Sequence, residues 1–589
     1  MKYDPYKQLK QLGHDLMFCD IIYQRPTKET GWHDYINIVY RDLDTEEKKI
    51  FTIQDPLYEI YTVKPEHRTF KKPRDFLERN KLDEHIIKYK DRFKEMAKII
   101  AEETGDKKYL DFISNAKGYK EQRMLFLYPY ILGADVSIEA YYISRWMREL
   151  GNDRPKTVTS FFLDIEVNSK AVHYEGDVPR HGECPIDAVT LIDGVTKISH
   201  TFLLKTPDNS QIDDFLTPGK KAEFKQKASE MFSEFDDIAD YKCYMFESEV
   251  ELLKQLFILI HNLKRDFGQI WNGCGFDFPY FVERLKVLKC DPKKFICHSD
   301  FPTTTLYYFE DTETFDFERK RSFITVSSYT HWIDQLIQYA SLRKSQGSMK
   351  KFSLDYVAEH EKVGRKIDHS YLGSFSEFSY SDYMLYVLYN INDVLLQYGI
   401  DDKTNDMTRY WSSCMNNSTP YKDGLKQTVT LRWMLYDFLK YDYDMILGNN
   451  ANFMNVDKKK TDDDEEDEDD SFEGAINSDP ELNEHVGLEL FGMKSKYLYG
   501  DSIDFDFSAM YPNIMIVFNI FKTTMIGKLI IENCESKLSY DEDAGKEFVE
   551  DMIAGDAIHT GHKWFNLPDG DEMTRLINEE LGGMMSNVA

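Results

Sequence analysis

Five side chains in the middle of the chain have types and spacings that suit metal-dependent hydrolysis. Asp164 and Glu166 lie two residues apart in TSFFLDIEV, and Asp277 lies in NGCGFDFPY. Tyr389 precedes Asp393 by four residues in YNINDV. Carboxylates among apolar residues repel one another and are costly to bury without a cation. Because oxygen ligands of this kind suit Mg²⁺ or Mn²⁺, we predict a metal site built from the four acids.

Each of these signals has a plain structural explanation when it is taken alone. The DxE pair fits solvated acids on an edge strand, and Asp277 fits a first-turn helix acid worth about 1 kcal/mol. Tyr389 and Asp393 fit a polar pair on a helix surface. The apolar neighbours Leu388 and Leu395 instead favour a buried helix, where an isolated acid is uncommon. Together and in this order, the signals favour a site.

The segments around these residues predict the elements that must position them. Side chains alternate along a strand, so Asp164 and Glu166 share one face, and the i, i+4 spacing places Tyr389 and Asp393 on one helix face. Strands followed by packed helices indicate an α/β multidomain chain with a layered domain at 158–400. The predicted strands are 159–167, 186–193 (its hairpin partner) and 269–273, and the predicted helices are 249–267, 278–288, 351–361, 381–400 and 424–444.

Composition narrows the class of protein. The 589 residues carry a net charge of −30, which argues against a non-specific DNA coat but leaves room for a local basic channel. None of the eight cysteines forms a CxxC pair, and the first residues lack the apolar core of a signal peptide. We therefore expect the cytoplasm, or the host cytoplasm for a viral protein. The run DDDEEDEDD at 462–470 predicts a disordered acidic tract over 458–470.

The three motifs in this order resemble the DEDD exonucleases, in the tyrosine-bearing branch with a ribonuclease-H-like fold (a mixed sheet with flanking helices). WNGCGFDFPYFVERL, FSLDYVAEHE and YNINDV are similar to segments of the proofreading domain of family B DNA polymerases from T-even-like bacteriophages. The resemblance implies a 3′→5′ exonuclease that uses two Mg²⁺ (or Mn²⁺) ions and releases 5′-dNMP. It implies that Asp164 bridges the ions, Glu166 and Asp393 complete the water-activating site, Asp277 supports the second ion, and Tyr389 orients the water.

Further residues are expected to contact nucleic acid or to support the site. Asn272 and two glycines fit a tight turn near a nucleotide, and Phe276 fits base stacking. The segment 307–326 predicts a hairpin, which helps to separate strands in the family and is otherwise an ordinary solvated turn. Asp334, in THWIDQL, is a fifth acid that is expected to support the metal ligands without binding the ions itself. The expected DNA contacts in this part of the chain are Asn272, Phe276, Arg319, Lys320 and Arg321.

The end of the chain resembles the start of a polymerase palm. SIDFDFSAMYPNI is similar to the family motif DxxSLYPSI, which implies a metal ligand at Asp506 and a sugar-screening residue at Tyr511. Asp504 shares a strand face with Asp506, so the register stays open. SFEGAIN resembles a loop that places Gly474 near the DNA backbone. The implied domains are 1–157 (N-terminal α+β), 158–400 (exonuclease), 401–490 (helical return and linker) and 491–589 (partial palm).

No KxxxNSxYG or DTD motif follows Asp506, so the notional palm lacks its second aspartate. We expect a split or truncated family B polymerase whose fingers and remaining palm motifs lie on a second polypeptide. The expected substrates are DNA primer-template and single-stranded 3′ ends, without a membrane. The alternatives are a non-catalytic structural subunit and an RNA-trimming exonuclease of the same class.

Overall fold

The computed structural model describes residues 3–116, 118–172, 179–206, 209–215, 217–344, 349, 351–369 and 377–449, and the backbone of 558–560 and 563–565. Contacts divide the chain into two units, residues 1–464 and 465–589. In the second unit, β17 (Ile558–Thr560) pairs antiparallel with β18 (Lys563–Phe565).

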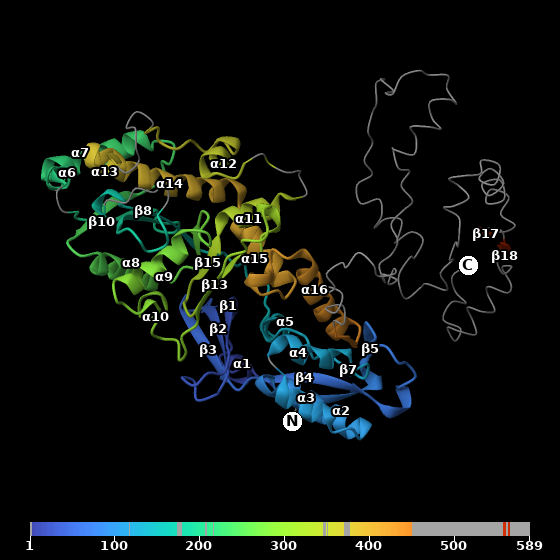
Figure 1. The fold of residues 1–589 in the computed structure, drawn as a ribbon. Coiled ribbons are helices and arrows are strands. Elements are labelled where there is room, and N and C mark those ends of the chain that lie inside the picture. The colour runs from blue at the N-terminus through green and yellow to red at the C-terminus, as the bar shows by residue number, and fades with distance from the viewer. Residues whose placement is uncertain are drawn as a thin grey trace, which may run out of the picture. The chain divides into compact units, whose positions relative to one another are not determined.

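Two small antiparallel sheets form the N-terminal part of the first unit (Figure 1). The first consists of β1 (Leu16–Gln24), β2 (Tyr35–Asp42) and β3 (Lys48–Gln54), and the second has the order β6 (Leu82–Lys88), β4 (Leu57–Val63), β7 (Ile131–Leu132). Many β-branched and aromatic residues, as in YINIVY, explain why these segments form strands, and β2 is buried along most of its length. The predicted N-terminal α+β region thus contains both strands and helices.

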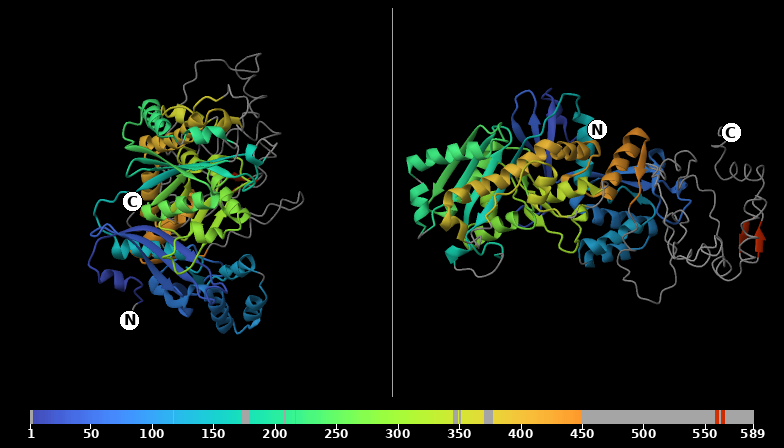
Figure 2. Two further views of the ribbon diagram at one scale, coloured as in Figure 1. Left: turned by 90° about the vertical axis from the view of Figure 1, so that its left-hand side faces the viewer. Right: turned by 90° about the horizontal axis from the view of Figure 1, so that it is seen from above.

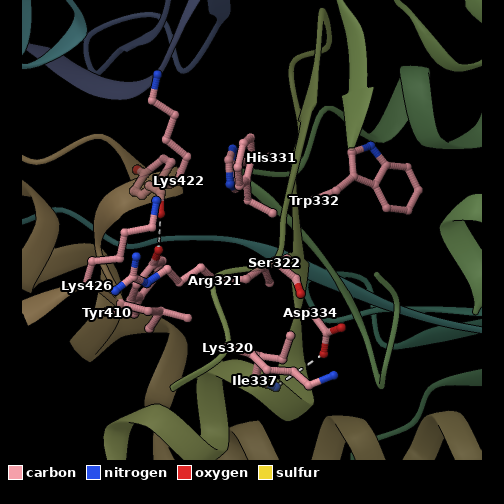
Figure 3. Close-up of a pocket in the computed structure, with 14 residues that line it drawn as sticks. Lys320, Arg321, Ser322, His331, Trp332, Asp334, Ile337, Tyr410, Lys422 and Lys426 are labelled. Atoms are coloured by element: carbon pink, nitrogen blue, oxygen red, sulfur yellow. Dashed lines mark hydrogen bonds between the residues drawn. The ribbon is translucent and has the colours of Figure 1, made fainter. Parts of the chain in front are cut away.

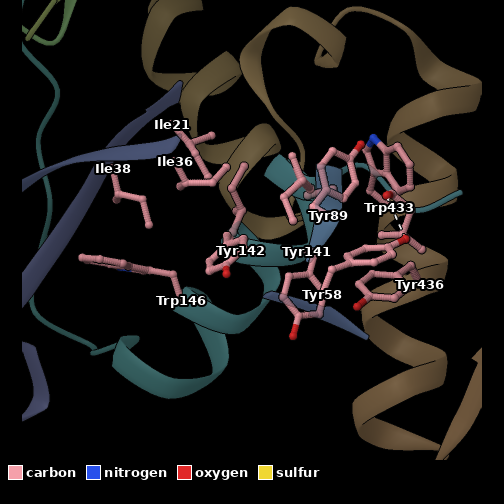
Figure 4. Packing of buried hydrophobic residues seen from close by; sticks show 14 of the residues in the cluster. Ile21, Ile36, Ile38, Tyr58, Tyr89, Tyr141, Tyr142, Trp146, Trp433 and Tyr436 are labelled. Carbon is pink, nitrogen blue, oxygen red and sulfur yellow. Dashed lines mark hydrogen bonds between the residues drawn. The ribbon is translucent and has the colours of Figure 1, made fainter. Parts of the chain in front are cut away.

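An aromatic cluster holds this part together (Figure 4). The ring centroids of Tyr58 and Tyr141 lie 5.5 Å apart, and Trp146 packs edge-on with nearby rings. Trp433 and Tyr436 of α16 (Gln427–Asp442) belong to the same cluster. Large aromatic rings bury much apolar area, so a helix that follows the central domain in sequence is anchored in the N-terminal core.

A six-stranded mixed sheet forms the centre of the unit, with the order β11-β10-β9-β8-β12-β15. Strand β8 pairs antiparallel with β9 and parallel with β12, and β12 pairs parallel with β15. The strands are β8 (Ser160–Val167), β9 (Ile186–Asp193), β10 (Ile198–Leu204), β11 (Asp240–Phe246), β12 (Phe267–Ile270) and β15 (His331–Asp334). The predicted α/β class with a ribonuclease-H-like mixed sheet is confirmed.

Helices cover both faces of this sheet (Figures 1 and 2). Phe161, Leu163 and Ile165 of β8 pack with α8 (Glu249–Leu263) and α9 (Asp277–Val287). Phe162 packs on the opposite face, in a cluster with α14 (Tyr383–Thr404). Successive side chains of a strand point to opposite faces of the sheet, so the odd-numbered residues of β8 face one helical layer and the even-numbered residues face the other.

Most helices and strands predicted for the central domain are present in the structure, and the two clearest differences are the end of α8 and the position of β12. The helix predicted to reach residue 267 ends at Leu263, because Lys264 adopts the left-handed conformation. Strand β12 begins at Phe267, whose N–H donates to the Thr159 carbonyl and starts the ladder with β8. The chain then turns at Asn272, where φ is 59°, so the predicted strand 269–273 is displaced toward its N-terminus.

Among the described residues, no helix is long and apolar enough to span a membrane.

The other helices and strands of the first unit have the following bounds. The helices are α1 (Lys7–Lys10), α2 (Arg92–Thr104), α3 (Lys108–Asn115), α4 (Tyr119–Gln122), α5 (Ile138–Leu150), α6 (Ser210–Phe215), α7 (Pro218–Met231), α10 (Pro292–Ile296), α11 (Gln335–Leu342), α12 (Leu354–His360), α13 (Phe378–Ser381) and α15 (Asp406–Asn416), and the strands are β5 (Phe76–Glu78), β13 (Leu306–Phe309), β14 (Phe323–Val326) and β16 (Met445–Leu447).

A buried ionic cluster joins the N-terminal sheet to the central sheet. The Asp266 carboxylate accepts from Arg41 at 2.5 Å and from the Thr159 amide at 2.8 Å, and it lies 2.8 Å from the Lys48 ammonium. Burial alone would raise the pKa of Asp266, but the two cations outweigh burial and lower that pKa to about 2. This carboxylate therefore neutralises two cations at the junction.

Replacing this carboxylate should strongly destabilise the unit. Asp266→Ala leaves Arg41 and Lys48 as uncompensated buried charges, so we expect the free energy of unfolding to fall by about 3–5 kcal/mol. Urea denaturation followed by circular dichroism measures the loss. Glu223→Ala removes an exposed ion pair with Lys220 and should change stability by less than about 1 kcal/mol. Equal losses in the two variants would contradict this account.

Candidate active site

Strand β8 presents Asp164 and Glu166 toward α14. Both side chains lie on the even-numbered face with Phe162, opposite the layer that contains α8 and α9. Because β8 is an interior strand between β9 and β12, neither acid lies at a sheet edge. The alternative of solvated acids on an edge strand is therefore wrong, although both side chains keep partial exposure.

Helix α14 supplies Tyr389 and Asp393 on the facing surface. It begins after Asp382, whose carboxylate accepts from the Leu385 amide, and both functional residues are buried along it. Asp164, Glu166 and Asp393 each place a carboxylate oxygen within 4.8 Å of the others. The structure thus brings together three predicted acids from segments more than 200 residues apart, and the surface-pair explanation of Asp393 is wrong.

Asp277 approaches the same strand from the side of α9. It is the first residue of α9, after the N-cap residue Phe276, and it is buried. Its Oδ1 accepts a hydrogen bond from the Ile165 amide at 3.3 Å. Burial, then the charge of Asp164, raise the pKa of Asp277 well above its usual value. Asp277 therefore borders the cluster of three acids but is not part of it.

The turn before Asp277 is held by Asp334. The Asn272 carbonyl accepts from the amides of Gly275 and Phe276, and a Cβ at Gly275 would lie 2.7 Å from the Asn272 Oδ1. At the end of β15, the Asp334 carboxylate accepts from the Cys274 amide at 2.9 Å and from the Ile337 amide at 3.2 Å. The predicted tight turn is present, and its geometry depends on a neighbouring strand.

The cluster is electrostatically unfavourable by itself. Burial, then the charge of Asp393, raise the pKa of Asp164 to about 7. Burial and the charges of Asp164 and Asp393 raise the pKa of Glu166 well above its usual value. Burial also raises the pKa of Asp393, against the effect of Lys366. The protein places several carboxylates where their charged forms are disfavoured, which is typical of functional sites.

The donor set fits a divalent cation. The cluster offers only carboxylate oxygens, which are the preferred ligands of Mg²⁺ and Mn²⁺. Asp393 Oδ1 is buried and has no hydrogen-bond partner within the described residues. An ion at this position would satisfy that oxygen and offset the repulsion between Asp164 and Glu166.

Lys366 is a site residue that sequence reasoning missed. Its ammonium donates to Asp393 Oδ2 at 2.5 Å and lies 3.4 Å from the Tyr389 hydroxyl. Burial alone would lower the pKa of Lys366, but the charge of Asp393 outweighs it and raises the pKa. The segment VGRKIDH has no motif, so its spacing gave no signal for this residue.

Two further residues border the acids: Asn390 donates a hydrogen bond to one of them, and Asp187 adds a negative charge that raises the pKa of Glu166. Asn390 donates to Asp164 Oδ2 at 3.0 Å. Asp187 on β9 accepts from the Tyr386 hydroxyl at 2.6 Å and from Asn168 at 2.9 Å, beside Glu166. Asn390 lies inside the motif YNINDV, so the sequence could have identified it as a site residue. The sequence could not identify Asp187, because a single acid in a predicted strand carries no specific signal.

The predicted hairpin is present in 306–326. Strands β13 and β14 pair antiparallel from Leu306 with Val326 to Phe309 with Phe323, and the basic run 319–321 precedes β14. Phe315, between the strands, is 95% exposed. The hairpin is confirmed, whereas DNA contacts by Arg319, Lys320 and Arg321 stay a prediction, as does stacking by Phe276.

Several predicted features lie outside the described residues. These are the polymerase metal ligand and its neighbour, the sugar-screening tyrosine, the loop glycine, the acidic tract and the palm region apart from β17 and β18, namely Asp506, Asp504, Tyr511, Gly474, 458–470 and the rest of 491–589. The structure does not test them, and they stay predictions.

Comparisons with known proteins agree with this architecture. Residues 163–357 match the model of the exonuclease domain of DNA polymerase family B. The DNA-directed DNA polymerase of Enterobacteria phage T4 is 22% identical over 404 residues, which cover 66% of this chain and 38% of that protein. The DNA polymerase of Bombyx mori nuclear polyhedrosis virus is 21% identical over 369 residues, covering 53% and 36% respectively.

A third relative is the DNA polymerase catalytic subunit of Alcelaphine herpesvirus 1, 28% identical over 137 residues, which cover 23% of this chain and 13% of that protein. The chain spans less than two fifths of the length of each of these three relatives. The mixed sheet and its covering helices define a ribonuclease-H-like domain. Its residues 163–357 match the exonuclease domain of DNA polymerase family B, and α14, which carries Asp393, follows the matched range.

Removing one carboxylate should stabilise the metal-free protein. The pKa of Asp164 is raised to about 7 in the folded state, so its ionisation destabilises the fold. This penalty is complete above about pH 7 and is lost gradually as the pH falls from there toward the ordinary carboxyl pKa of about 4. We expect Asp164→Asn in EDTA to increase the free energy of unfolding by roughly 1–3 kcal/mol at pH 8 and by less at pH 5.5.

Urea unfolding at the two pH values measures this gain. Asp402→Asn, an exposed acid on the same helix, is the matched control and should leave stability unchanged at both pH values. In magnesium we expect the wild type to become the more stable of the two proteins, because the ion stabilises it more than it stabilises Asp164→Asn. A variant that is less stable than the wild type in EDTA at pH 8 would refute the repulsion argument.

Proposed function

We propose that this chain is a 3′→5′ DNA exonuclease that proofreads for a family B DNA polymerase. The observation that carries the proposal is the cluster of Asp164, Glu166 and Asp393, with Asp277 at its border. Asp164, Glu166 and Asp277 lie within the region that matches the family's exonuclease domain. A purely structural subunit gains nothing from four repelling carboxylates around one strand, so the non-catalytic alternative is disfavoured.

Asp164, Glu166 and Asp393 would hold the first of two Mg²⁺ or Mn²⁺ ions, and Asp277 with Asp164 would hold the second. Bound ions of this class supply a stronger nucleophile from water and charge stabilisation at both attacking and leaving oxygens. Within the cluster, Asn390 orients Asp164 and Lys366 orients Asp393. The Tyr389 hydroxyl, 3.4 Å from the Lys366 ammonium, would hold the attacking water in position.

The proposed substrate is a frayed DNA 3′ end, from which the enzyme releases 5′-dNMP. The names of the three viral relatives support DNA as the polymer. Asn272 and Phe276 lie in the turn that leads to Asp277, so they would contact the terminal nucleotides. Phe276 packs against Tyr280 with ring centroids 5.2 Å apart. Its partly buried ring is a suitable platform for a base.

The polymerase half of the proposal rests on sequence alone. Asp506, Tyr511 and Gly474 would act in a palm with primer-template DNA. A second polypeptide with the fingers and remaining palm motifs stays a prediction, as does a cytoplasmic location.

Nuclease assays test the exonuclease directly. We expect wild-type protein with Mg²⁺ to shorten 5′-labelled single-stranded DNA from its 3′ end and to release 5′-dNMP. Asp164→Ala removes a ligand from the cluster and should slow the reaction by at least about 1,000-fold, since metal charge is worth several kcal/mol. Asp402→Ala, an exposed acid outside the cluster, should retain the wild-type rate.

Absence of hydrolysis by well-folded wild-type protein would falsify the proposal. An RNA strand of the same sequence, assayed in parallel, separates the DNA exonuclease from the RNA-trimming alternative, which predicts faster hydrolysis of RNA. Product analysis distinguishes 5′-monophosphates from other cleavage products.

Lys366 should be needed for hydrolysis although it holds no metal. Lys366→Ala removes the cation that positions Asp393 and borders Tyr389, so we expect the rate to fall by about 10- to 1,000-fold. Lys366→Arg keeps the charge and should recover part of the rate. Lys362→Ala, four residues earlier and exposed, is the matched control. A wild-type rate in Lys366→Ala would show that this ion pair has no role in the reaction.

A further inference from the structure

Asp187 on β9 is a buried carboxylate to which the proposed hydrolysis gives no role. Its side chain is 2% exposed, and it is not a member of the cluster of three acids. Asp334, another buried acid of the sheet, has an ordinary structural role, because it accepts from backbone amides such as that of Ile337 (Figure 3). Asp187 instead accepts hydrogen bonds from two side chains that lie outside its own strand.

An irregularity in the pairing of β8 with β9 turns Asp187 toward α14. Val167 pairs with Ile186, and Glu166 pairs with Ala188, so β9 has one extra residue at this point. Ile186 packs in the layer of α8 and α9, whereas Ala188 packs on the face that α14 covers. A β-bulge of this kind redirects a side chain and is common beside active sites. Asp187 therefore lies on the α14 side of the sheet, beside Glu166.

The Asp187 carboxylate joins β9 to α14 and to the end of β8. Its Oδ1 accepts from the Tyr386 hydroxyl of α14 at 2.6 Å, and its Oδ2 accepts from Asn168, the residue after β8, at 2.9 Å. The Asn168 amide donates to the Pro185 carbonyl at 2.8 Å, directly before β9. Because Tyr386 and Asn168 are both buried, water competes little with these hydrogen bonds.

Tyr386 lies one helical turn before Tyr389, on the same face of α14. Both rings pack edge-on against the ring of Phe378, with centroid distances of 5.5 Å for Tyr386 and 5.6 Å for Tyr389. Asp393 follows one turn after Tyr389, so the three side chains form a row along the helix. A hydrogen bond that holds the first member of this row also fixes the direction of the second.

We propose that Asp187 is a positioning residue for hydrolysis, which acts through its hydrogen bond to Tyr386 and sets the place of the Tyr389 hydroxyl. The proposal rests on the proposed function, in which Tyr389 holds the attacking water. A displacement of about 1 Å at such a group can slow an enzyme about 100-fold. Asp187 therefore affects the rate without contact with a metal ion or with the substrate.

A fluorine probe at position 389 tests this coupling without hydrolysis. 3-Fluorotyrosine is placed at position 389 of the full chain by amber suppression, and its ¹⁹F resonance is recorded in EDTA. We expect the same resonance in the wild-type background and in Asp187→Asn, because the asparagine amide oxygen still accepts from Tyr386. Tyr386→Phe and Asp187→Ala both remove the hydrogen bond, so each should shift or broaden the resonance.

Nuclease rates test the consequence for the reaction. We expect Tyr386→Phe to lower kcat by about 10- to 100-fold with little change in KM, and Asp187→Asn to retain most of the rate. In a Tyr389→Phe background, the same Tyr386→Phe change should lower kcat by less than about 2-fold, because the hydroxyl that it positions is already absent.

Tyr398→Phe is the matched control, because Tyr398 lies on the same helix and its hydroxyl also donates to a carboxylate, that of Asp237. This control should leave both the resonance and kcat unchanged, although it removes a similar hydrogen bond. A general loss of helix stability would instead change both quantities in Tyr386→Phe and Tyr398→Phe alike, and that result would overturn the proposal.

Two further outcomes contradict the positioning role. A resonance that Tyr386→Phe leaves unchanged, in a protein that hydrolyses DNA normally, overturns this proposal and leaves the proposed function intact. Equal losses of rate in Asp187→Asn and Asp187→Ala, with a wild-type rate in Tyr386→Phe, would assign the effect to the negative charge beside Glu166 and overturn it as well. An inactive wild-type protein overturns the proposed function, so the two failures are distinguishable.

Discussion

Repulsion among carboxylates on one face of β8 is the constraint on which the candidate site depends. Asp164 and Glu166 point toward α14 from an interior strand, and Asp393 approaches them from that helix. Burial makes every negative charge there less favourable. Asn390 and Lys366 relieve part of the repulsion, and the buried Oδ1 of Asp393 has no hydrogen-bond partner among the described residues. The described side chains therefore do not neutralise the cluster, which is the condition that a bound cation would meet.

The fold can maintain this arrangement because both sheet faces are packed. Phe161, Leu163 and Ile165 anchor β8 against α8 and α9, while the apolar side of α14 packs on the opposite face. Packed interiors resist displacement, so the carboxylates cannot simply separate to reduce their repulsion. The buried cluster around Asp266 and the aromatic core that includes α16 join this sheet to the N-terminal part.

The chain also separates charge over its surface. Its acidic residues outnumber its basic ones by 30, yet cations gather where the hairpin meets the start of α16.

The sequence by itself determined the fold class, the DxE strand, the turn before Asp277, the helix with YxxxD and the hairpin, because each depends on local periodicity or on a compact motif. It did not determine the positions of Lys366 and Asp187, since neither lies in a recognisable pattern. Nor did it decide between a cluster and scattered surface acids. Only the tertiary structure decided those points, because strand order and the packing of α14 bring residues more than 200 positions apart within 4.8 Å.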